Sequence, residues 1–159
     1  MCDMKICKAE SYDYAAMLEI WERAVRATHS FLTETDIEEL RPQVKEAFQA
    51  VGELYALHLD DGQAAGFMGL TPPDGDRRAK LEMLFVDPAY HGRGLGYELT
   101  CHALEKYPDL DVDVNEQNPK AAAFYEKCGF VVIGRSEIDG EGRPFPLLHL
   151  RKAPSVSIA

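Results

Sequence analysis

The segment LEMLFVDPAYHGRGLGYEL, residues 81–99, runs from an apolar stretch through an Asp-Pro pair into three closely spaced glycines. The apolar stretch predicts a strand from Ala79 to Val86, and the spacing of Leu95, Leu99 and Ala103 predicts a helix after the glycines. A strand, a glycine loop and a helix N-terminus direct several backbone N–H groups at one point, which suits an anionic phosphate. Taken alone, the loop is compatible with a phosphate site or with a structural turn.

The glycine loop does not follow the common nucleotide-binding patterns. A dinucleotide fingerprint needs G-x-G-x-x-G, and Gly92 and Gly94 fit its first two positions, but the third position is Tyr97. The chain has no Walker sequence either. These two classes of nucleotide-binding loop are therefore excluded.

Length, charge and cysteine spacing narrow the class of protein. A chain of 159 residues, 46% of them hydrophobic, predicts one globular domain. The net charge of −10 argues against nucleic-acid binding, which depends on clustered Lys and Arg. The four cysteines are scattered without a CxxC pair, so neither a disulfide nor a metal site is expected.

The hydropathy pattern indicates the cellular compartment of the protein. No apolar run approaches the ~20 residues that are needed to span a bilayer. Charged residues interrupt the N-terminal segment MCDMKICKAE, residues 1–10, where a secretory signal would need a continuous apolar stretch. We therefore expect a cytoplasmic protein.

Helical and strand patterns alternate along the chain. Helices are predicted at 11–28, at 35–51, from the glycine loop to Tyr107, and from Asn118 to Gly129. Strands are predicted at 5–8, 53–59, 64–70, 79–86, 110–114, 131–138 and 144–150. This order indicates an α/β (α+β) fold with a mixed sheet in one domain, residues 1–152, followed by a loose tail at 153–159.

A second motif, NPKAAAFYEKCGF at residues 118–130, predicts a helix with Asn118 as its N-cap and Gly129 as its stop. Together with HGRGLG at 91–96, it resembles the Gcn5-related N-acetyltransferase (GNAT) superfamily. That family's phosphate loop follows Q/R-x-x-G-x-G/A, and its second cofactor motif matches N-P-x-A-x-x-F-Y-x-x-x-G-F. The resemblance implies a single GNAT-type domain whose mostly antiparallel, twisted sheet has about six to seven strands flanked by about four helices.

The resemblance extends beyond the two cofactor motifs. The stretch LFVDPAY at 84–90 matches the family's strand and Asp-Pro turn. The segments at 21–32 and 134–150 look like the YjaB-type bacterial members, so that most of the chain is covered. One residue departs from the pattern, because His91 stands where the family usually has Gln or Arg.

The resemblance implies acetyl-CoA as the cofactor, CoA as the product and an amine as the acceptor. In this family the strand before the loop is bulged and splays from its neighbour, which leaves backbone groups free for pantetheine. The glycine loop would then take the pyrophosphate. The residues implied to bind the cofactor are Leu84, Phe85, Val86, His91, Gly92, Arg93, Gly94, Leu95, Gly96, Tyr97, Asn118 and Tyr125.

Two residues are implied to be catalytic, Tyr125 and Glu82. Tyr125 would donate a proton to the coenzyme sulfur, since a tyrosine with its usual pKa of about 10 is protonated at neutral pH. Its helical spacing also fits an ordinary core aromatic. Glu82 would act as the base through water, because the family often uses a carboxylate near that position. A solvated strand carboxylate is the alternative, and His29 competes for the role of base.

The cofactor motifs leave acceptor recognition to other segments, and in the superfamily the first two helices line the acceptor side. The residues implied to bind the acceptor are Trp21, Arg26, His29 and Phe31. The helical phase of Trp21 also predicts a place in the core. Arg26 would repel a bare ammonium, so we expect it to bind a carboxylate or carbonyl of a peptide or amino-acid-like acceptor.

The predicted function is an N-acetyltransferase that moves the acetyl group of acetyl-CoA to a primary amine of a lysine, an N-terminus or an amino-acid-like small molecule. The alternative is a non-catalytic acyl-CoA-binding or sensing module, because a fold does not fix a function. Tyr125 favours the enzyme, whereas His91 favours the alternative. The expected partners are acetyl-CoA and the acceptor, with neither nucleic acid nor membrane, and a homodimer stays open.

Overall fold

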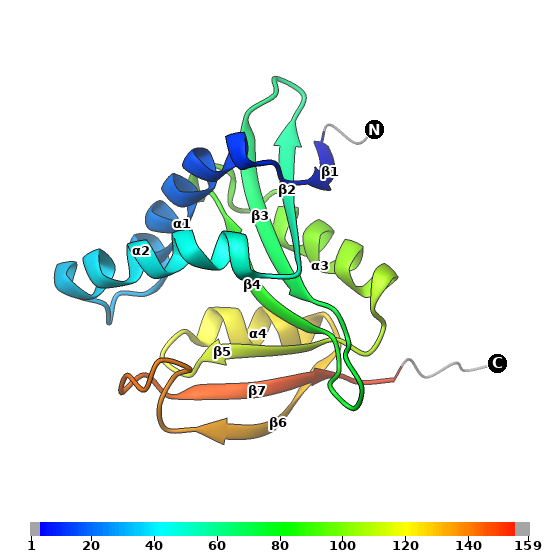
Figure 1. Ribbon diagram of the computed structural model, residues 1–159. Helices are drawn as coiled ribbons and strands as arrows, with labels where there is room; N and C mark the ends of the chain where they lie inside the picture. The colour runs from blue at the N-terminus through cyan, green and yellow to red at the C-terminus, as the bar shows by residue number, and fades with distance from the viewer. Residues whose placement is uncertain (1–3, 155–159) are drawn as a thin grey trace.

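The computed structural model describes residues 4–154, which form one seven-stranded sheet with helices on both faces (Figure 1). The strands are β1 Met4–Lys8, β2 Glu53–Leu59, β3 Ala64–Thr71, β4 Lys80–Val86, β5 Asp111–Asn115, β6 Phe130–Ser136 and β7 Leu147–Lys152. The helices are α1 Tyr14–Thr28, α2 Glu34–Ala50, α3 Leu95–Lys106 and α4 Pro119–Lys127, with 3₁₀ turns at Ser11–Asp13 and Pro88–Tyr90.

The strand order is β1-β2-β3-β4-β5-β7-β6, and all neighbouring pairs are antiparallel except β4 with β5. The predicted α/β (α+β) class with a mostly antiparallel sheet is confirmed. The parallel pair arises because α3 carries the chain from the end of β4 back to the start of β5.

The boundaries of the last hairpin differ from the prediction. The sequence predicts a strand at 144–150, but β7 begins at Leu147. Pro144 and Pro146 precede it, and proline has no N–H to pair with a neighbouring strand. In the partner strand, β6 ends at Ser136 rather than at residue 138.

The chain stays attached to the sheet slightly beyond β7. Ala153, the first residue of the predicted loose tail, donates its N–H to the carbonyl oxygen of Gly129 at 2.9 Å. Residues 155–159 of that tail lie outside the described part of the chain.

The strands β4 and β5 run side by side for only two residue pairs, Lys80 with Asp111 and Leu81 with Val112. Beyond these pairs the two strands diverge, as Figure 1 shows. The sheet is therefore split over the second half of β4, and the backbone of that half has a partner strand on the β3 side alone.

A β-bulge lies where the two strands separate. On β3, Gly69 and Leu70 are adjacent, but they pair with Met83 and Leu81 of β4, so Glu82 is the extra residue. A bulge bends its strand and increases the local twist. This bulge turns β4 away from β5 and opens the sheet.

A hydrophobic core packs against each face of the sheet. The larger core lies between the sheet and helices α3 and α4, where Leu95, Leu99 and Ala103 of α3 are buried, as their spacing predicts. The second core lies under α1 and α2 and includes Met17, Ile20, Trp21, Val25, Ile37, Phe48, Leu54 and Phe67. Both sides of the split sheet are thus held by packed helices.

We expect Leu99→Ala to lower the free energy of unfolding by about 2–5 kcal/mol, because Leu99 is fully buried and its truncation leaves a cavity between α3 and the sheet. Urea unfolding followed by circular dichroism measures the loss. Glu105→Ala, on the exposed side of the same helix, is the control and should change stability by no more than about 0.5 kcal/mol. Equal losses in the two variants would contradict the burial of Leu99.

Candidate functional site

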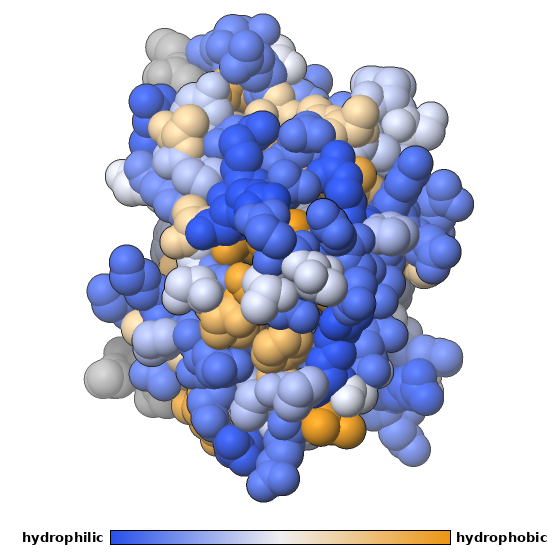
Figure 2. All heavy atoms as spheres, turned by 90° about the vertical axis from the view of Figure 1, so that its left-hand side faces the viewer, coloured by the Kyte–Doolittle hydropathy of each residue, from blue (hydrophilic) through white to orange (hydrophobic). Residues whose placement is uncertain are grey.

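A cavity of about 700 Å³ occupies the gap between the diverging strands β4 and β5. Its walls come from both faces of the sheet, namely the end of α1, both strands, the glycine loop, the first turn of α3 and the first two turns of α4. Figure 2 shows the side of the molecule that lies at the left of Figure 1, where apolar residues surface in a central band framed by hydrophilic ones. Residues from both faces of the sheet can therefore contact a molecule in this gap.

The structure brings most of the predicted cofactor residues together around this cavity. Those in its lining are Leu84, Phe85, Val86, His91, Gly92, Gly94, Leu95, Gly96, Tyr97, Asn118 and Tyr125. Glu82 and His29, from the predicted catalytic and acceptor sets, line it as well. Arg93 is absent from the lining, and its guanidinium lies 5.3 Å from the centre of the Tyr90 ring.

The glycine loop has the geometry of an anion cradle. Gly92 and Gly94 have φ values of +81° and +75°, which residues with a side chain rarely adopt, and a Cβ on either would meet no atom within 4 Å. Within residues 4–154, the backbone N–H groups from Gly92 to Tyr97 donate no hydrogen bond to a protein acceptor. These free donors at the start of α3 fit the phosphates of a nucleotide cofactor.

Gly96 and His91 lie at the two ends of the loop. Gly96 is already helical, and a Cβ there would lie 3.5 Å from the Phe124 ring, so this position concerns the packing of α3 against α4. The imidazole of His91 lies back along β4, with Nε2 at 3.2 Å from the carbonyl oxygen of Val86. His91 replaces the Gln or Arg that is usual in the family, and its imidazole is a polar group in the cavity wall.

Asp87, at the turn between β4 and the loop, is buried and holds the loop to helix α1. Its carboxylate accepts hydrogen bonds from Arg23 at 2.7 Å and from the N–H of Ala89 at 3.1 Å. Burial acts to raise the pKa of Asp87, but these hydrogen bonds outweigh it and lower the pKa below its usual value. The ionised carboxylate therefore fixes the loop relative to α1.

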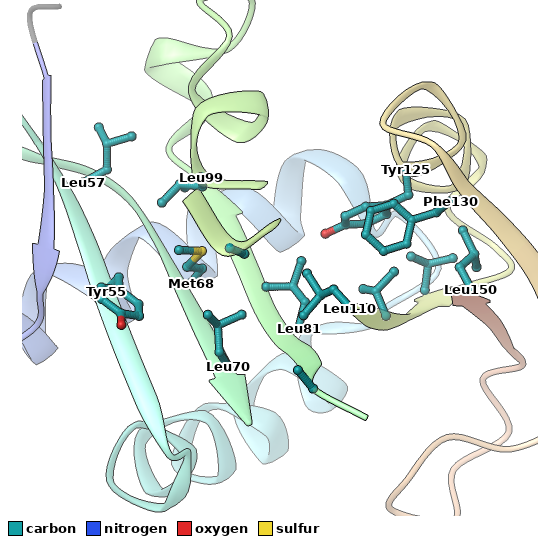
Figure 3. Packing of buried hydrophobic residues seen from close by; sticks show 14 of the residues in the cluster. Tyr55, Leu57, Met68, Leu70, Leu81, Leu99, Leu110, Tyr125, Phe130 and Leu150 are labelled. Atoms are coloured by element: carbon teal, nitrogen blue, oxygen red, sulfur yellow. The ribbon is translucent and has the colours of Figure 1, made fainter. Parts of the chain in front are cut away.

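Tyr125 places its ring in the core and its hydroxyl at the cavity. The ring packs edge-on against Phe124 at 5.0 Å and Phe130 at 5.5 Å, and Figure 3 shows the hydroxyl pointing away from Phe130. In the described part of the chain the hydroxyl has no hydrogen-bond partner. Burial raises the pKa of Tyr125, so the group is protonated at neutral pH and can donate to an atom in the cavity.

Glu82, the bulge residue, is engaged by neighbours on the face of the sheet that carries no α4. Its carboxylate accepts a hydrogen bond from the Thr71 hydroxyl at 2.8 Å and lies 3.6 Å from Nζ of Lys80. Lys80 in turn pairs with Asp113 of β5 at 2.8 Å. Asp113 also lines the cavity and bonds Nδ1 of His149 at 2.6 Å.

The sequence prediction missed Asp113 and Asn115, which both line the cavity. The signal was present in the alternation of β5, because Val112 and Val114 are buried in the larger core and the polar residues between them face the other side. What the alternation does not indicate is that this polar side borders the gap to β4.

A second cavity of about 170 Å³ joins the first at His29, Phe85 and Asn115, which line both. Its other walls include the predicted acceptor residues Trp21 and Phe31. An aromatic row borders it, because the ring of Phe31 lies 5.4 Å from that of His29 and 5.5 Å from that of Phe145. Phe145, in the loop between β6 and β7, was not predicted.

Arg26, the fourth predicted acceptor residue, lines neither cavity. Its guanidinium bonds both carboxylate oxygens of Glu34, at 2.5 and 2.9 Å, and reaches Glu22 at 3.4 Å on the exposed side of α1. The helical phase of this residue turns it away from the sheet. Its position favours an ion-pair anchor between α1 and α2 over the expected role in acceptor binding.

Residues 14–130 match the Acetyltransferase (GNAT) family, and the chain belongs to that family. It is an N-acetyltransferase that uses acetyl-CoA as its acetyl donor. The chain is 42% identical to the peptidyl-lysine N-acetyltransferase YjaB of Salmonella typhimurium over 134 residues, which cover 84% of this chain and 88% of the relative. Identity to YjaB of Escherichia coli is 41%, over 84% and 86% of the two chains.

Solved structures give the same result for the fold. The solution structure of apo-form YjaB from Escherichia coli matches with a TM-score of 0.80 and 34% identity, covering 98% of this chain and all of the other. The PaiA N-acetyltransferase from Thermoplasma acidophilum, solved with coenzyme A, matches with a TM-score of 0.75 at 19% identity over 96% of this chain and 100% of the other. The expected family, fold and cofactor are confirmed.

Two further properties of the described residues bear on the site. Within residues 4–154, no group of three or more His, Cys, Asp or Glu side chains is placed to hold a metal ion. No helix in that range has the length and apolar character that crossing a membrane requires.

We expect Asp87→Asn to lower the urea midpoint at pH 7, because it removes the carboxylate that holds Arg23 and the loop. Folding lowers the pKa of Asp87, so its stabilisation is present above about pH 4, where the unfolded carboxyl is ionised, and is lost as pH falls through the lower folded pKa. The difference between parent and variant should therefore shrink at pH 2–3.

Asp76→Asn, which changes an exposed aspartate in the β3–β4 loop, is the control and should leave the urea midpoint at pH 7 nearly unchanged. A difference between parent and Asp87→Asn that stays constant from pH 7 to pH 2 would show that the ionised carboxylate is not what stabilises the loop.

Proposed function

We propose that this protein acetylates the side-chain amine of lysine residues in peptides or proteins. The carrying observation is its similarity, at 42% and 41% identity over 84% of the chain, to two relatives named as peptidyl-lysine N-acetyltransferases. The two joined cavities support the proposal, because a transferase needs a place for each of its two substrates. One cavity lies along the glycine loop, and the other lies between the C-terminal end of α1 and the β6–β7 loop.

The first cavity would hold the acetyl donor. Acetyl-CoA supplies an acetyl group activated as a thioester. The free N–H groups of residues 92–97 would bind its pyrophosphate, and the backbone of Leu84, Phe85 and Val86, without a partner strand on the β5 side, would run along its pantetheine. Asn118, whose side chain accepts the N–H of Ala121 at 3.3 Å, would fix the start of α4 beside the site.

The second cavity would take the acceptor. Its apolar walls, including Trp21, Phe31 and Phe145, suit the four-carbon stem of a lysine. Carboxylates of Glu82, Asp113 and Asp139 line the joined cavities and would attract the ammonium group. Because Arg26 lines neither cavity, the choice of a peptide acceptor rests on the two relatives rather than on a basic residue at the site.

Tyr125 supports catalysis over the alternative of a non-catalytic acyl-CoA sensor. Its protonated hydroxyl at the cavity is suited to donate a proton to the departing sulfur. We take the acetyltransferase domain as residues 1–152, since the sheet ends at Lys152. A cytoplasmic location, the lack of nucleic-acid binding and a homodimer stay predictions.

We expect Tyr125→Phe to lower kcat with a lysine peptide by about 10²-fold or more while the Kd for acetyl-CoA stays within a few-fold. The change removes the hydroxyl and keeps the ring between Phe124 and Phe130. Steady-state assays of CoA release and calorimetry provide the two values. Tyr12→Phe, at a tyrosine that is 82% exposed, is the matched control and should leave both unchanged.

Two results would count against the proposal. An unchanged kcat in Tyr125→Phe would return this residue to a purely structural role. Turnover of small amines together with none of any lysine peptide would overturn the lysine acceptor and leave the acetyltransferase intact.

We expect Gly94→Ala to raise the Kd for acetyl-CoA about tenfold. At φ +75° an alanine costs about 1–2 kcal/mol of strain, which shifts the loop donors, and 1.4 kcal/mol corresponds to a factor of ten. Gly62→Ala is the control, because Gly62 has φ +84° and open space around it but lies in the turn between β2 and β3. Both variants should lose similar stability, and a parent-like Kd in Gly94→Ala would remove the loop from the cofactor site.

A further inference from the structure

His29 lies where the two cavities meet. It follows the last residue of α1, where its N–H donates to the carbonyl oxygen of Val25 at 2.8 Å, and its carbonyl oxygen accepts from Leu32 at 3.0 Å. Its ring packs at 5.4 Å from the ring of Phe31 and lines both cavities. An acceptor amine that passes from the smaller cavity to the larger one therefore passes this imidazole.

The hydrogen bonds around His29 fix which ring nitrogen carries the proton. The hydroxyl of Thr28 donates to the carbonyl oxygen of Ala24 at 2.8 Å, and its oxygen lies 2.7 Å from Nδ1 of His29. A hydroxyl has one proton, so both contacts are hydrogen bonds only when Thr28 donates to Ala24 and Nδ1 donates to Thr28. The lone pair of the neutral ring is then on Nε2.

The Nε2 atom of His29 is only partly buried and, in the described part of the chain, unpaired. Within residues 4–154 it has no hydrogen-bond partner, and no fully buried side-chain nitrogen or oxygen in this range lacks one. Nε2 is therefore not fully enclosed, and the residue that carries it lines both cavities. Burial also lowers the pKa of His29, so the ring is neutral at neutral pH and free to accept a proton.

Two of the three carboxylates that line the cavities, those of Glu82 and Asp113, are engaged by neighbouring side chains. Glu82 is held by Thr71 and Lys80. Burial acts to raise the pKa of Asp113, but hydrogen bonds from Lys80 and His149 outweigh it and lower the pKa. The other titratable side chains that line the two cavities are Tyr90, His91, Tyr97, Lys120, Tyr125 and Asp139.

We propose that Nε2 of His29 is the general base that takes the proton from the acceptor ammonium; this assignment rests on the proposed lysine acetyltransferase function. One N–H bond of R–NH₃⁺ breaks and an Nε2–H bond forms, which leaves imidazolium and a neutral amine. The amine nitrogen forms a bond to the acetyl carbonyl carbon, and the carbon–sulfur bond breaks with its electron pair on sulfur. The departing sulfur takes a proton from the hydroxyl of Tyr125, and the nitrogen of the new amide loses its second proton to restore that hydroxyl. His29 then returns its proton to water.

The kinetic test is His29→Gln, whose amide keeps a polar group near Nε2 but accepts no proton at these pH values. We expect kcat with a lysine peptide to fall about 10²-fold at pH 7, while the Kd for acetyl-CoA and the acceptor KM stay within a few-fold. The defect should shrink toward pH 10, where a lysine amine with its usual pKa of about 10.4 is neutral without a base. His102→Gln, on α3 outside both cavities, is the matched control and should behave like the parent.

A second measurement does not depend on activity. Long-range ¹H–¹⁵N correlation spectra of the histidine rings should show His29 protonated on Nδ1 and unprotonated on Nε2 at pH 7. Thr28→Val removes the acceptor for Nδ1, so the spectrum should lose this single tautomer and kcat should fall several-fold, whereas Thr28→Ser should restore both. Thr28 is thus a positioning residue for His29.

Three outcomes separate the possible failures. Parent-like kcat and pH dependence in His29→Gln, with an active parent, would overturn the base assignment and leave the proposed function standing. A proton on Nε2 of His29 in the parent spectrum would overturn it as well. An inactive parent with every lysine peptide would overturn the proposed function itself, and the assignment with it.

Discussion

Pairing between β4 and β5 stops after Leu81 and Val112, and the backbone that a continuous sheet would pair beyond this point faces a cavity of about 700 Å³. Backbone N–H and C=O groups in a protein interior are nearly always paired. The second half of β4 therefore needs a partner that is not a strand of this chain, and an extended ligand can take that place. The bulge at Glu82 produces the divergence, so one inserted residue creates both the cavity and the free edge that lines it.

Helix α1 connects the two ends of this site. Near its middle, Arg23 holds the buried Asp87 and with it the turn that leads into the glycine loop. At its end, His29 forms the wall shared by the two cavities. The position of the loop and the position of the acceptor wall are thus set by one rigid helix, packed through Met17 and Val25 on the second core.

The acceptor wall is completed by a segment distant in sequence. Arg143 of the β6–β7 loop pairs with Glu39 of α2 at 3.0 Å, and this contact brings Phe145 beside Phe31. On the face of the sheet opposite α4, side chains link three strands. Asp113 of β5 contacts Lys80 of β4 at 2.8 Å and His149 of β7 at 2.6 Å. These polar links hold the strands around the cavity in place where no helix covers them.

The sequence by itself determined the local features. The glycines at 92 and 94, the N-cap at Asn118, the buried face of α3 and the place of Tyr125 on its helix follow from backbone preferences and periodicity, which act over a few neighbouring residues. The family motif then indicated the cofactor. Tertiary structure alone decided that the pairing of β4 with β5 ends after two residue pairs, that Phe145 meets Phe31, and that Glu34 is the partner of Arg26. Each of these depends on contacts between segments whose pairing no local pattern encodes, since strand register and loop docking are set by the packing of the whole sheet.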